Sequence, residues 1–212
     1  METKRFDIIT EADARVLEPG STVRLAARGH ITPLAADTLR ERRITVIGED
    51  MRATPQGMSL VPVADVRRIA IGSDHVGFDL KAHLIGVLRG RGLQVQDAGT
   101  LEKTPVDYPD VAAAVSKIVA RQEADAGIVI DGAGLGSAIA ANKIGGIRAA
   151  MCLNETLARY SREHNGANVL TLGATLVSAD EAVAIVLRFL ETPMREPRYI
   201  ARLEKIARLE HF

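Results

Sequence analysis

The sequence predicts an α/β protein with a doubly wound parallel sheet, preceded by a small α+β appendage. From Arg68 onward, short apolar segments alternate with amphipathic segments of helical length. Two of the apolar segments, GIVI at 127–130 and NVLTL at 168–172, are apolar at nearly consecutive positions, which is typical of strands covered by helices on both faces. Pro55, Gly57 and Pro62 lie in a stretch without periodicity, which indicates a connection between two units. The second unit therefore fits a three-layer, Rossmann-like arrangement.

The predicted boundaries are an appendage at 1–50, a linker at 51–66 and a main domain at 67–212. In the appendage we expect strands at 7–10, 22–25 and 44–47 and a helix at 33–42. Thr32 and Pro33 predict the start of that helix, because Thr is a common N-cap residue and Pro suits the first helical position. A unit of about 50 residues is marginal alone, so we expect it to pack on the main domain or on a partner subunit.

The main domain should carry five strands, each followed by a helix, and a further helix at the end. The strands are expected at 69–73, 94–97, 127–130, 149–153 and 169–172, and the helices at 77–90, 109–121, 136–143, 155–163, 179–190 and 196–210. Ligands of open α/β sheets bind beyond the carboxyl ends of the strands, so a site is expected in the loops that follow strands.

Composition excludes several classes of protein. Hydrophobic residues make up 47% and charged residues 25%, unlike disordered, collagen-like or coiled-coil chains. Lys+Arg and Asp+Glu are balanced at 27 each, so no basic excess supports nucleic-acid binding. The single cysteine, Cys152, excludes an internal disulfide and a multi-cysteine zinc site. With no apolar run of about 18 residues and a charged start, we expect a cytoplasmic protein without a membrane segment.

Two loops that follow predicted strands carry titratable or anion-binding groups. Asp74 and His75 follow the first strand of the main domain, where they fit either a catalytic pair or an N-cap beside a surface histidine. Asp131 opens the second loop, whose amides could converge on an anion because of three glycines, Gly132, Gly134 and Gly136. A dinucleotide fingerprint would need glycine at position 137, which is Ser137.

Two further motifs lie late in the chain. His164 and Asn165 follow the helix predicted at 155–163, where a histidine fits either a helix cap or a catalytic role. Arg198 and Arg202 are four residues apart and so share one helix face. Such a pair fits a solvated basic stripe or a phosphate site with charge-assisted hydrogen bonds.

The motifs occur together and in order along the chain. They are GSDHVGFDLK (72–81), DAGT (97–100), VDYPD (106–110), GIVIDGAGLGSAIAANKIGGIRAAMC (127–152), REHNGANVLTLG (162–173) and RYIARLEKI (198–206). This set resembles the type B ribose-5-phosphate isomerase family, which includes the galactose-6-phosphate isomerase subunits. The resemblance covers about 69–206. It implies interconversion of aldose and ketose phosphates through an enediolate, without a metal or an organic cofactor.

The resemblance also implies roles for individual residues. It places Asp74 and His75 at the sugar, Tyr108 in the pocket wall, His164 at ring opening, Asn165 with the amides of Gly132–Gly136 on the enediolate oxygens, and Arg198 with Arg202 on the phosphate, with Arg148 adding charge. It further implies a homodimer or higher homo-oligomer whose sites draw residues from both subunits. Outside the covered range, the first part of the chain resembles N-terminal segments of some bacterial microcompartment enzymes, which implies association with such a compartment.

The chain departs from the family pattern in two respects, the base and a hydroxyl residue. Many members have a proton-abstracting Cys where this chain has Asp131, and others have a Glu where it has Ser137. Asp131 is the acidic candidate in that loop, and a partly buried carboxylate can act as a general base. The family's usual hydroxyl residue is also replaced, by Ala133, so backbone N–H groups would have to stabilise the anion alone.

The sequence thus predicts an aldose–ketose isomerase for a small phosphorylated sugar, with ribose 5-phosphate as the default substrate. Asp131, His164, Asp74 and His75 are the predicted catalytic residues. The alternative is a catalytically impaired sugar-phosphate-binding or scaffold subunit, which the two departures and the appendage motivate. The sequence does not determine the carbon number or stereochemistry of the sugar.

Overall fold

The computed structural model describes residues 4–48 and 60–210, and the chain divides into two compact units, Met1–Ala53 and Thr54–Phe212. Most of the predicted linker, 51–59, lies outside the described residues. Its remainder, 60–66, belongs to the larger unit, where the backbone carbonyls of Leu60 and Val63 accept hydrogen bonds from arginines at 3.0 and 2.6 Å.

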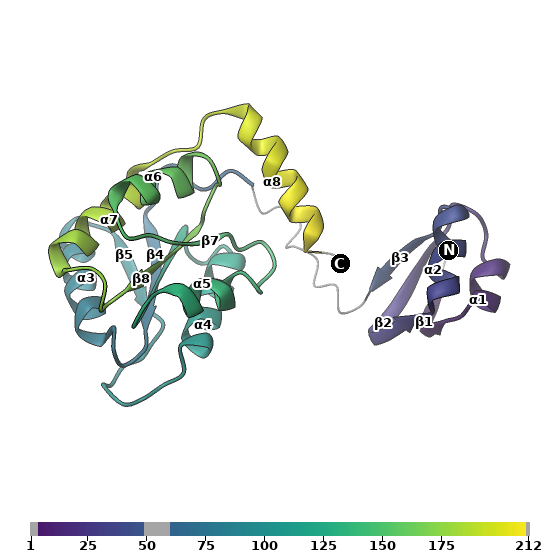
Figure 1. Cartoon of the computed structure of the whole chain (residues 1–212), viewed down its shortest axis with the longest axis horizontal. Coiled ribbons are helices and arrows are strands. Elements are labelled where there is room, and N and C mark those ends of the chain that lie inside the picture. The colour runs from purple at the N-terminus through teal and green to yellow at the C-terminus, as the bar shows by residue number, and fades with distance from the viewer. Residues whose placement is uncertain (1–3, 49–59, 211–212) are drawn as a thin grey trace. The chain divides into compact units, whose positions relative to one another are not determined.

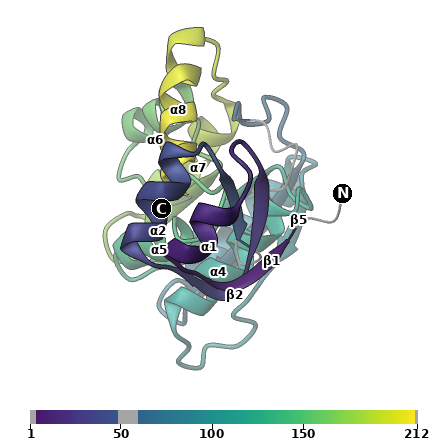
Figure 2. The same cartoon turned by 90° about the vertical axis from the view of Figure 1, so that its right-hand side faces the viewer.

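The N-terminal unit is a three-stranded parallel sheet with two helices on one side (Figure 2). Its elements are β1 (Arg5–Ile9), α1 (Glu11–Val16), β2 (Thr22–Ile31), α2 (Pro33–Glu41) and β3 (Thr45–Gly48). The sequence prediction lacked α1, which supplies the crossover that parallel neighbours require. A capping box between Thr10 and Asp13 starts this helix. Thr32 holds the N-cap position of α2 as predicted, but its side chain makes no capping hydrogen bond.

The larger unit contains one five-stranded parallel sheet in the order β5-β4-β6-β8-β7. Its strands are β4 (Arg68–Ser73), β5 (Gln94–Asp97), β6 (Ala126–Asp131), β7 (Ala149–Met151) and β8 (Val169–Gly173). Its helices are α3 (Phe78–Gly90), α4 (Tyr108–Ala120), α5 (Leu135–Ala141), α6 (Glu155–Glu163), α7 (Ala179–Glu191) and α8 (Pro197–Leu209). All eleven elements match the prediction to within two residues at each end.

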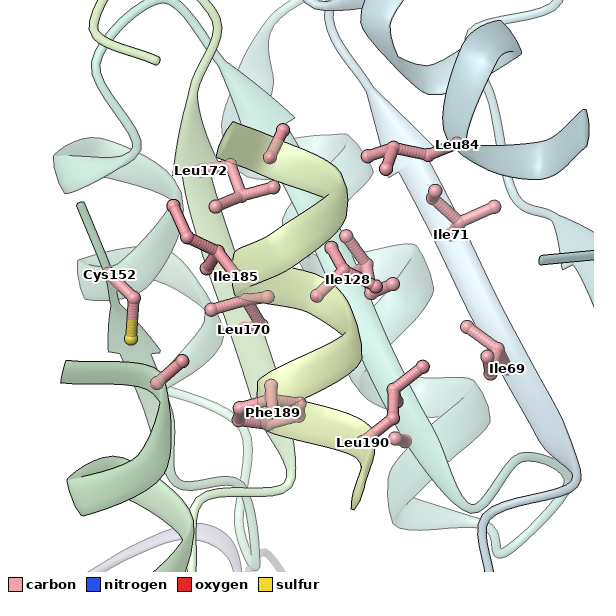
Figure 3. Close-up of a cluster of buried hydrophobic side chains, with 14 of the residues drawn as sticks. Ile69, Ile71, Leu84, Ile128, Cys152, Leu170, Leu172, Ile185, Phe189 and Leu190 are labelled. Atoms are coloured by element: carbon pink, nitrogen blue, oxygen red, sulfur yellow. The ribbon is translucent and has the colours of Figure 1, made fainter. Parts of the chain in front are cut away.

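Helices cover both faces of this sheet, as the consecutive apolar residues of the strands require (Figure 1). One core lies between the sheet and α3, α6 and α7, and includes Ile71, Leu84, Ile128 and Phe189 (Figure 3). The other lies between the sheet and α4 with α5. None of the helices in the described part of the chain combines the length and the apolar character of a membrane span.

Candidate active site

The loops that follow β4, β6 and β8 meet at the carboxyl edge of the sheet. The strand order reverses between β4 and β6, and crevices at such a point are where open α/β sheets bind ligands. The N–H of Asp74, after β4, donates to the carbonyl of Ile130 in β6 at 3.0 Å. The N–H of Ala174, after β8, donates to the carbonyl of Asp131 at 2.8 Å. Asp74 and Asp131 are therefore held on neighbouring loops.

The Asp131 side chain folds back onto its own loop. Its Oδ1 accepts hydrogen bonds from the N–H of Ala133 at 2.8 Å and from that of Gly134. Its Oδ2 accepts from the N–H and the hydroxyl of Ser137, at 3.0 and 2.5 Å. The side chain is buried, and its four donors fill the lone-pair positions of a carboxylate. In this structure the carboxylate predicted to be the base therefore leaves no lone-pair position free for a substrate.

The same loop is fixed from outside by two threonines. The hydroxyl of Thr171 donates to the carbonyl of Gly134, and that of Thr175 to the carbonyl of Gly132, both at 2.7 Å. Gly134 has a φ of +78°, which favours glycine. Gly136 faces the ring of Tyr108, and a Cβ there would lie 2.5 Å from the ring, so a larger residue would displace the Tyr108 side chain. The predicted pocket residue Tyr108 thus lies against the predicted anion loop.

Asp74 and His75 lie where α3 is about to begin. Oδ1 of Asp74 accepts from the N–H groups of Val76 and Gly77, both at 2.9 Å. Oδ2 accepts no hydrogen bond from the described residues and is not fully excluded from solvent. Nδ1 of His75, in contrast, is solvent-excluded and has no partner. Asp74 therefore combines an N-cap-like turn with one carboxylate oxygen that accepts no hydrogen bond from the described residues.

His164 and the two arginines form a second cluster. The His164 ring stacks on Tyr160, with centroids 4.6 Å apart, and lies 4.7 Å from the ring of Tyr199 on α8. The guanidinium groups of Arg198 and Arg202 lie 4.8 and 5.6 Å from the centroid of that Tyr199 ring. This geometry brings the two predicted phosphate ligands close to the histidine.

The second cluster lies at the opposite edge of the sheet. Residues 164–168 lead from α6 into the start of β8, and the carbonyl of Arg148, just before β7, accepts from the N–H of Asn168 at 3.1 Å. Because the strands are parallel, this is the amino edge, whereas Asp74, Tyr108 and Asp131 lie at the carboxyl edge. Beside Asn165 a hollow of about 570 Å³ opens between residues 142–150 and the end of α8. One chain therefore does not bring all the predicted site residues together.

Two arginines, the buried Arg162 and the half-buried Arg148, support the amino-edge cluster, and their structural role was not predicted. Arg162 has no exposed surface and donates to the carbonyls of Val63, Ala167 and Thr192, at 2.6, 3.0 and 3.3 Å. Arg148 donates to the carbonyls of Gly166 and Leu60, at 2.8 and 3.0 Å. Burial, with the nearby positive charge of Arg148, lowers the pKa of Arg162 to about 10. Both side chains tie the 164–168 loop to residues 60–63.

Cys152 is the one thiol in the chain, and it does not substitute for the family's catalytic cysteine. It is buried in the core beside α6 and α7 (Figure 3). Burial raises the pKa of the thiol to about 11, so it stays protonated at neutral pH. In the described residues, no group of three or more His, Cys, Asp or Glu side chains could hold a metal ion.

Known proteins resemble the larger unit. The model of the Ribose/Galactose Isomerase family matches residues 69–206. Ribose-5-phosphate isomerase B of Escherichia coli is 42% identical over 145 residues, 68% of this chain and 97% of the relative. A putative sugar phosphate isomerase of Rickettsia conorii is 41% identical over 65% of this chain and 96% of its own.

Solved structures agree with these relatives. Ribose-5-phosphate isomerase B of Clostridium thermocellum superimposes with a TM-score of 0.67 at 47% identity, covering 68% of this chain and 97% of its own. The type B enzyme of Trypanosoma brucei has a TM-score of 0.66 at 41% identity, covering 68% and 99%. The range matched by the family model begins after the N-terminal unit.

Proposed function

The chain belongs to the ribose/galactose isomerase family, and we propose that it interconverts ribose 5-phosphate and ribulose 5-phosphate. It is an aldose–ketose isomerase of phosphorylated sugars. The observation that supports ribose 5-phosphate as the substrate is a sequence identity of 42–47% to proteins named for this sugar phosphate. The match covers 97% of the length of these proteins.

The proposed active unit is a homodimer in which each site joins two half-sites. The carboxyl edge of one subunit supplies Asp74, His75, Tyr108 and the 131–137 loop. The amino edge of the partner supplies His164, Asn165 and the arginine pair. The separation of these groups within one chain supports this arrangement, because a sugar phosphate cannot reach both edges of one sheet. Exposed apolar side chains on α5 and α6, Leu135, Ile139 and Leu157, offer surface for a second copy.

In this arrangement the two half-sites have different tasks. The carboxyl edge carries the carboxylates that can move a proton between C1 and C2 of the sugar. The partner's Arg198 and Arg202 would bind the phosphate with charge-assisted hydrogen bonds, and His164 beside them would assist ring opening. The groups named supply acid, base and anion binding, so the reaction needs no metal or organic cofactor.

Substrate specificity is tested with four-, five- and six-carbon aldose phosphates, followed by NMR in deuterated water. We expect conversion of ribose 5-phosphate to the ketose with deuterium at the carbon that receives the proton. The highest kcat/KM on a tetrose or hexose phosphate would refute the substrate. Binding without conversion of any of them would instead favour an impaired sugar-phosphate-binding subunit.

For the N-terminal unit, we propose the attachment role implied by its resemblance to segments of microcompartment enzymes. The sheet face away from α1 and α2, which carries exposed Arg24, Thr45 and Ile47, is the contact surface that we propose. Co-purification of the full chain, but not of a chain that starts at Met58, with intact microcompartments would agree with this role. Equal recovery of both chains would contradict it.

A further inference from the structure

Two carboxylates at the carboxyl edge, Asp74 and Asp131, are candidates for the base that abstracts the proton from the sugar. We propose that Asp74 is this base, and that Asp131 is a positioning residue that holds the 131–137 loop. The assignment rests on the proposed isomerase function and concerns the same site. It reverses the expectation drawn from the position of the family's cysteine.

Asp131 is unsuited to accept a proton from a substrate carbon. Each of its oxygens already accepts two hydrogen bonds, from three backbone N–H groups and the Ser137 hydroxyl. A carboxylate has about four lone-pair positions, so a fifth donor would have to displace one of these. Breaking a buried hydrogen bond to a charged group is costly, and here it would also release the loop. The Asp131 carboxylate thus binds the N–H groups of its own loop and holds that loop in place.

Asp74 has the complementary arrangement. Its Oδ1 alone accepts the N–H groups of Val76 and Gly77, which fixes the orientation of the carboxylate. Its Oδ2 has no donor among the described residues and is not fully excluded from solvent, while the residue as a whole is buried, with 7% of its surface exposed. A base that is oriented, largely desolvated and free at one oxygen is what proton abstraction from carbon requires.

The other groups near this edge do not offer an equivalent carboxylate. Nδ1 of His75 is solvent-excluded, so this ring nitrogen cannot reach a substrate in this conformation. The Ser137 hydroxyl is buried and donates to Asp131. The Cys152 thiol is in the core. Asp79, in the first turn of α3, is exposed and pairs with Lys103 at 2.5 Å.

Oδ2 of Asp74 takes the proton from C2 of the open-chain aldose, the C2–H electron pair forms the C1=C2 bond, and the C1 carbonyl pair moves onto its oxygen. The carboxylic acid then returns a proton to C1, while the C2 hydroxyl loses its proton to the C1 oxygen. No oxidant, reductant or co-reactant is consumed.

The test compares Asp74→Asn, Asp131→Asn and the control Asp79→Asn in the full chain. Asn at 74 keeps the Oδ1 acceptor for the Val76 and Gly77 amides and replaces only the free oxygen, so the turn is preserved. Asn at 131 directs its NH₂ group toward the two Ser137 donors and so disturbs the loop. Isomerisation of ribose 5-phosphate, deuterium exchange and the Kd of ribitol 5-phosphate, which lacks the carbonyl, are measured for each.

Asp74→Asn should lower kcat and deuterium exchange by about 100-fold or more, with the Kd of ribitol 5-phosphate within about threefold of wild type. Asp131→Asn should mainly raise KM and the Kd, by about tenfold, with kcat within about tenfold. Asp79→Asn should match wild type.

A deuterium-exchange rate of Asp74→Asn within about threefold of wild type would overturn the assignment. This comparison is decisive even if Asp131→Asn fails to fold. An Asp131→Asn enzyme that binds ribitol 5-phosphate normally but loses about 100-fold in kcat would also overturn it. A wild-type chain that exchanges no deuterium with any sugar phosphate would instead refute the proposed function, and the assignment with it.

Discussion

Replacing the buried Arg162 by Met should destabilise the larger unit substantially. The Met side chain retains the apolar stem against Phe189 but leaves the carbonyls of Val63, Ala167 and Thr192 without a donor. Each buried acceptor that loses its partner costs about 1–3 kcal/mol. Removing a guanidinium that is itself costly to bury offsets part of this sum. We therefore expect a net loss of about 3–5 kcal/mol in the free energy of unfolding.

Urea unfolding followed by tyrosine fluorescence measures this loss. The chain has no tryptophan, and its three tyrosines, 108, 160 and 199, all lie in the larger unit, so the signal reports that unit. Arg159→Met is the matched control, because Arg159 lies on the same helix, is exposed and pairs with Glu163 at 3.6 Å. The control should lose less than about 0.5 kcal/mol. An Arg162→Met chain within about 1 kcal/mol of wild type would refute the role of the carbonyl contacts.

Three further outcomes follow from the structure. Arg198→Ala and Arg202→Ala should each raise KM for the phosphorylated sugar about tenfold or more in steady-state kinetics, and unchanged kinetics in both would remove them from the phosphate site. Because burial raises the pKa of Cys152 to about 11, iodoacetamide at about pH 8 should leave activity intact, and rapid stoichiometric inactivation would contradict the buried thiol. Burial acts to raise the pKa of Asp125, but hydrogen bonds from the Arg68 side chain and two backbone N–H groups outweigh it, so the pKa in the folded protein is lowered. The ionised Asp125 therefore stabilises the fold above the unfolded pKa of about 3.9, and this stabilisation is lost as pH falls through the lower folded pKa. The stability difference between wild type and Asp125→Asn should therefore shrink from about pH 5 to about pH 3 in urea titrations, and a constant difference would contradict the shift.

The main sheet could be predicted from sequence because burial on both faces leaves a direct pattern. Strands such as Ile128 to Ile130 must be apolar at consecutive positions, and helices must return the chain between them. The short helix α1 was missed because its six residues carry little periodicity. The Thr10 and Asp13 capping box was its available signal.

The candidate site was predictable in its residues but not in its internal contacts. Asp131 lies where the sequence placed it, yet residue type does not specify whether a short carboxylate points to a ligand or to its own loop. Its spacing from Gly134 and Ser137 fits capping of α5 equally well. The contacts of Arg162 with Val63 and Thr192 join segments 99 and 30 residues away, which no local pattern reveals.

The separation of the half-sites could have been inferred from strand direction alone. Asp131 follows a strand, whereas His164 precedes one, so the two lie at opposite edges of any parallel sheet. This separation is the reason for our proposal that the motifs which the family resemblance assigns to one pocket come from two copies of the chain.

Subunit complementation tests this shared site most directly. Asp74→Asn disables the carboxyl-edge half-site and His164→Ala the amino-edge half-site, so each homodimer should be inactive. In a mixed dimer, one site combines the intact Asp74 of one subunit with the intact His164 of the other. Half of randomly mixed dimers are mixed, each with one intact site of two, so refolding the variants together should restore about a quarter of wild-type activity. Mixed dimers that form, as native mass spectrometry would show, but stay inactive would contradict the shared site.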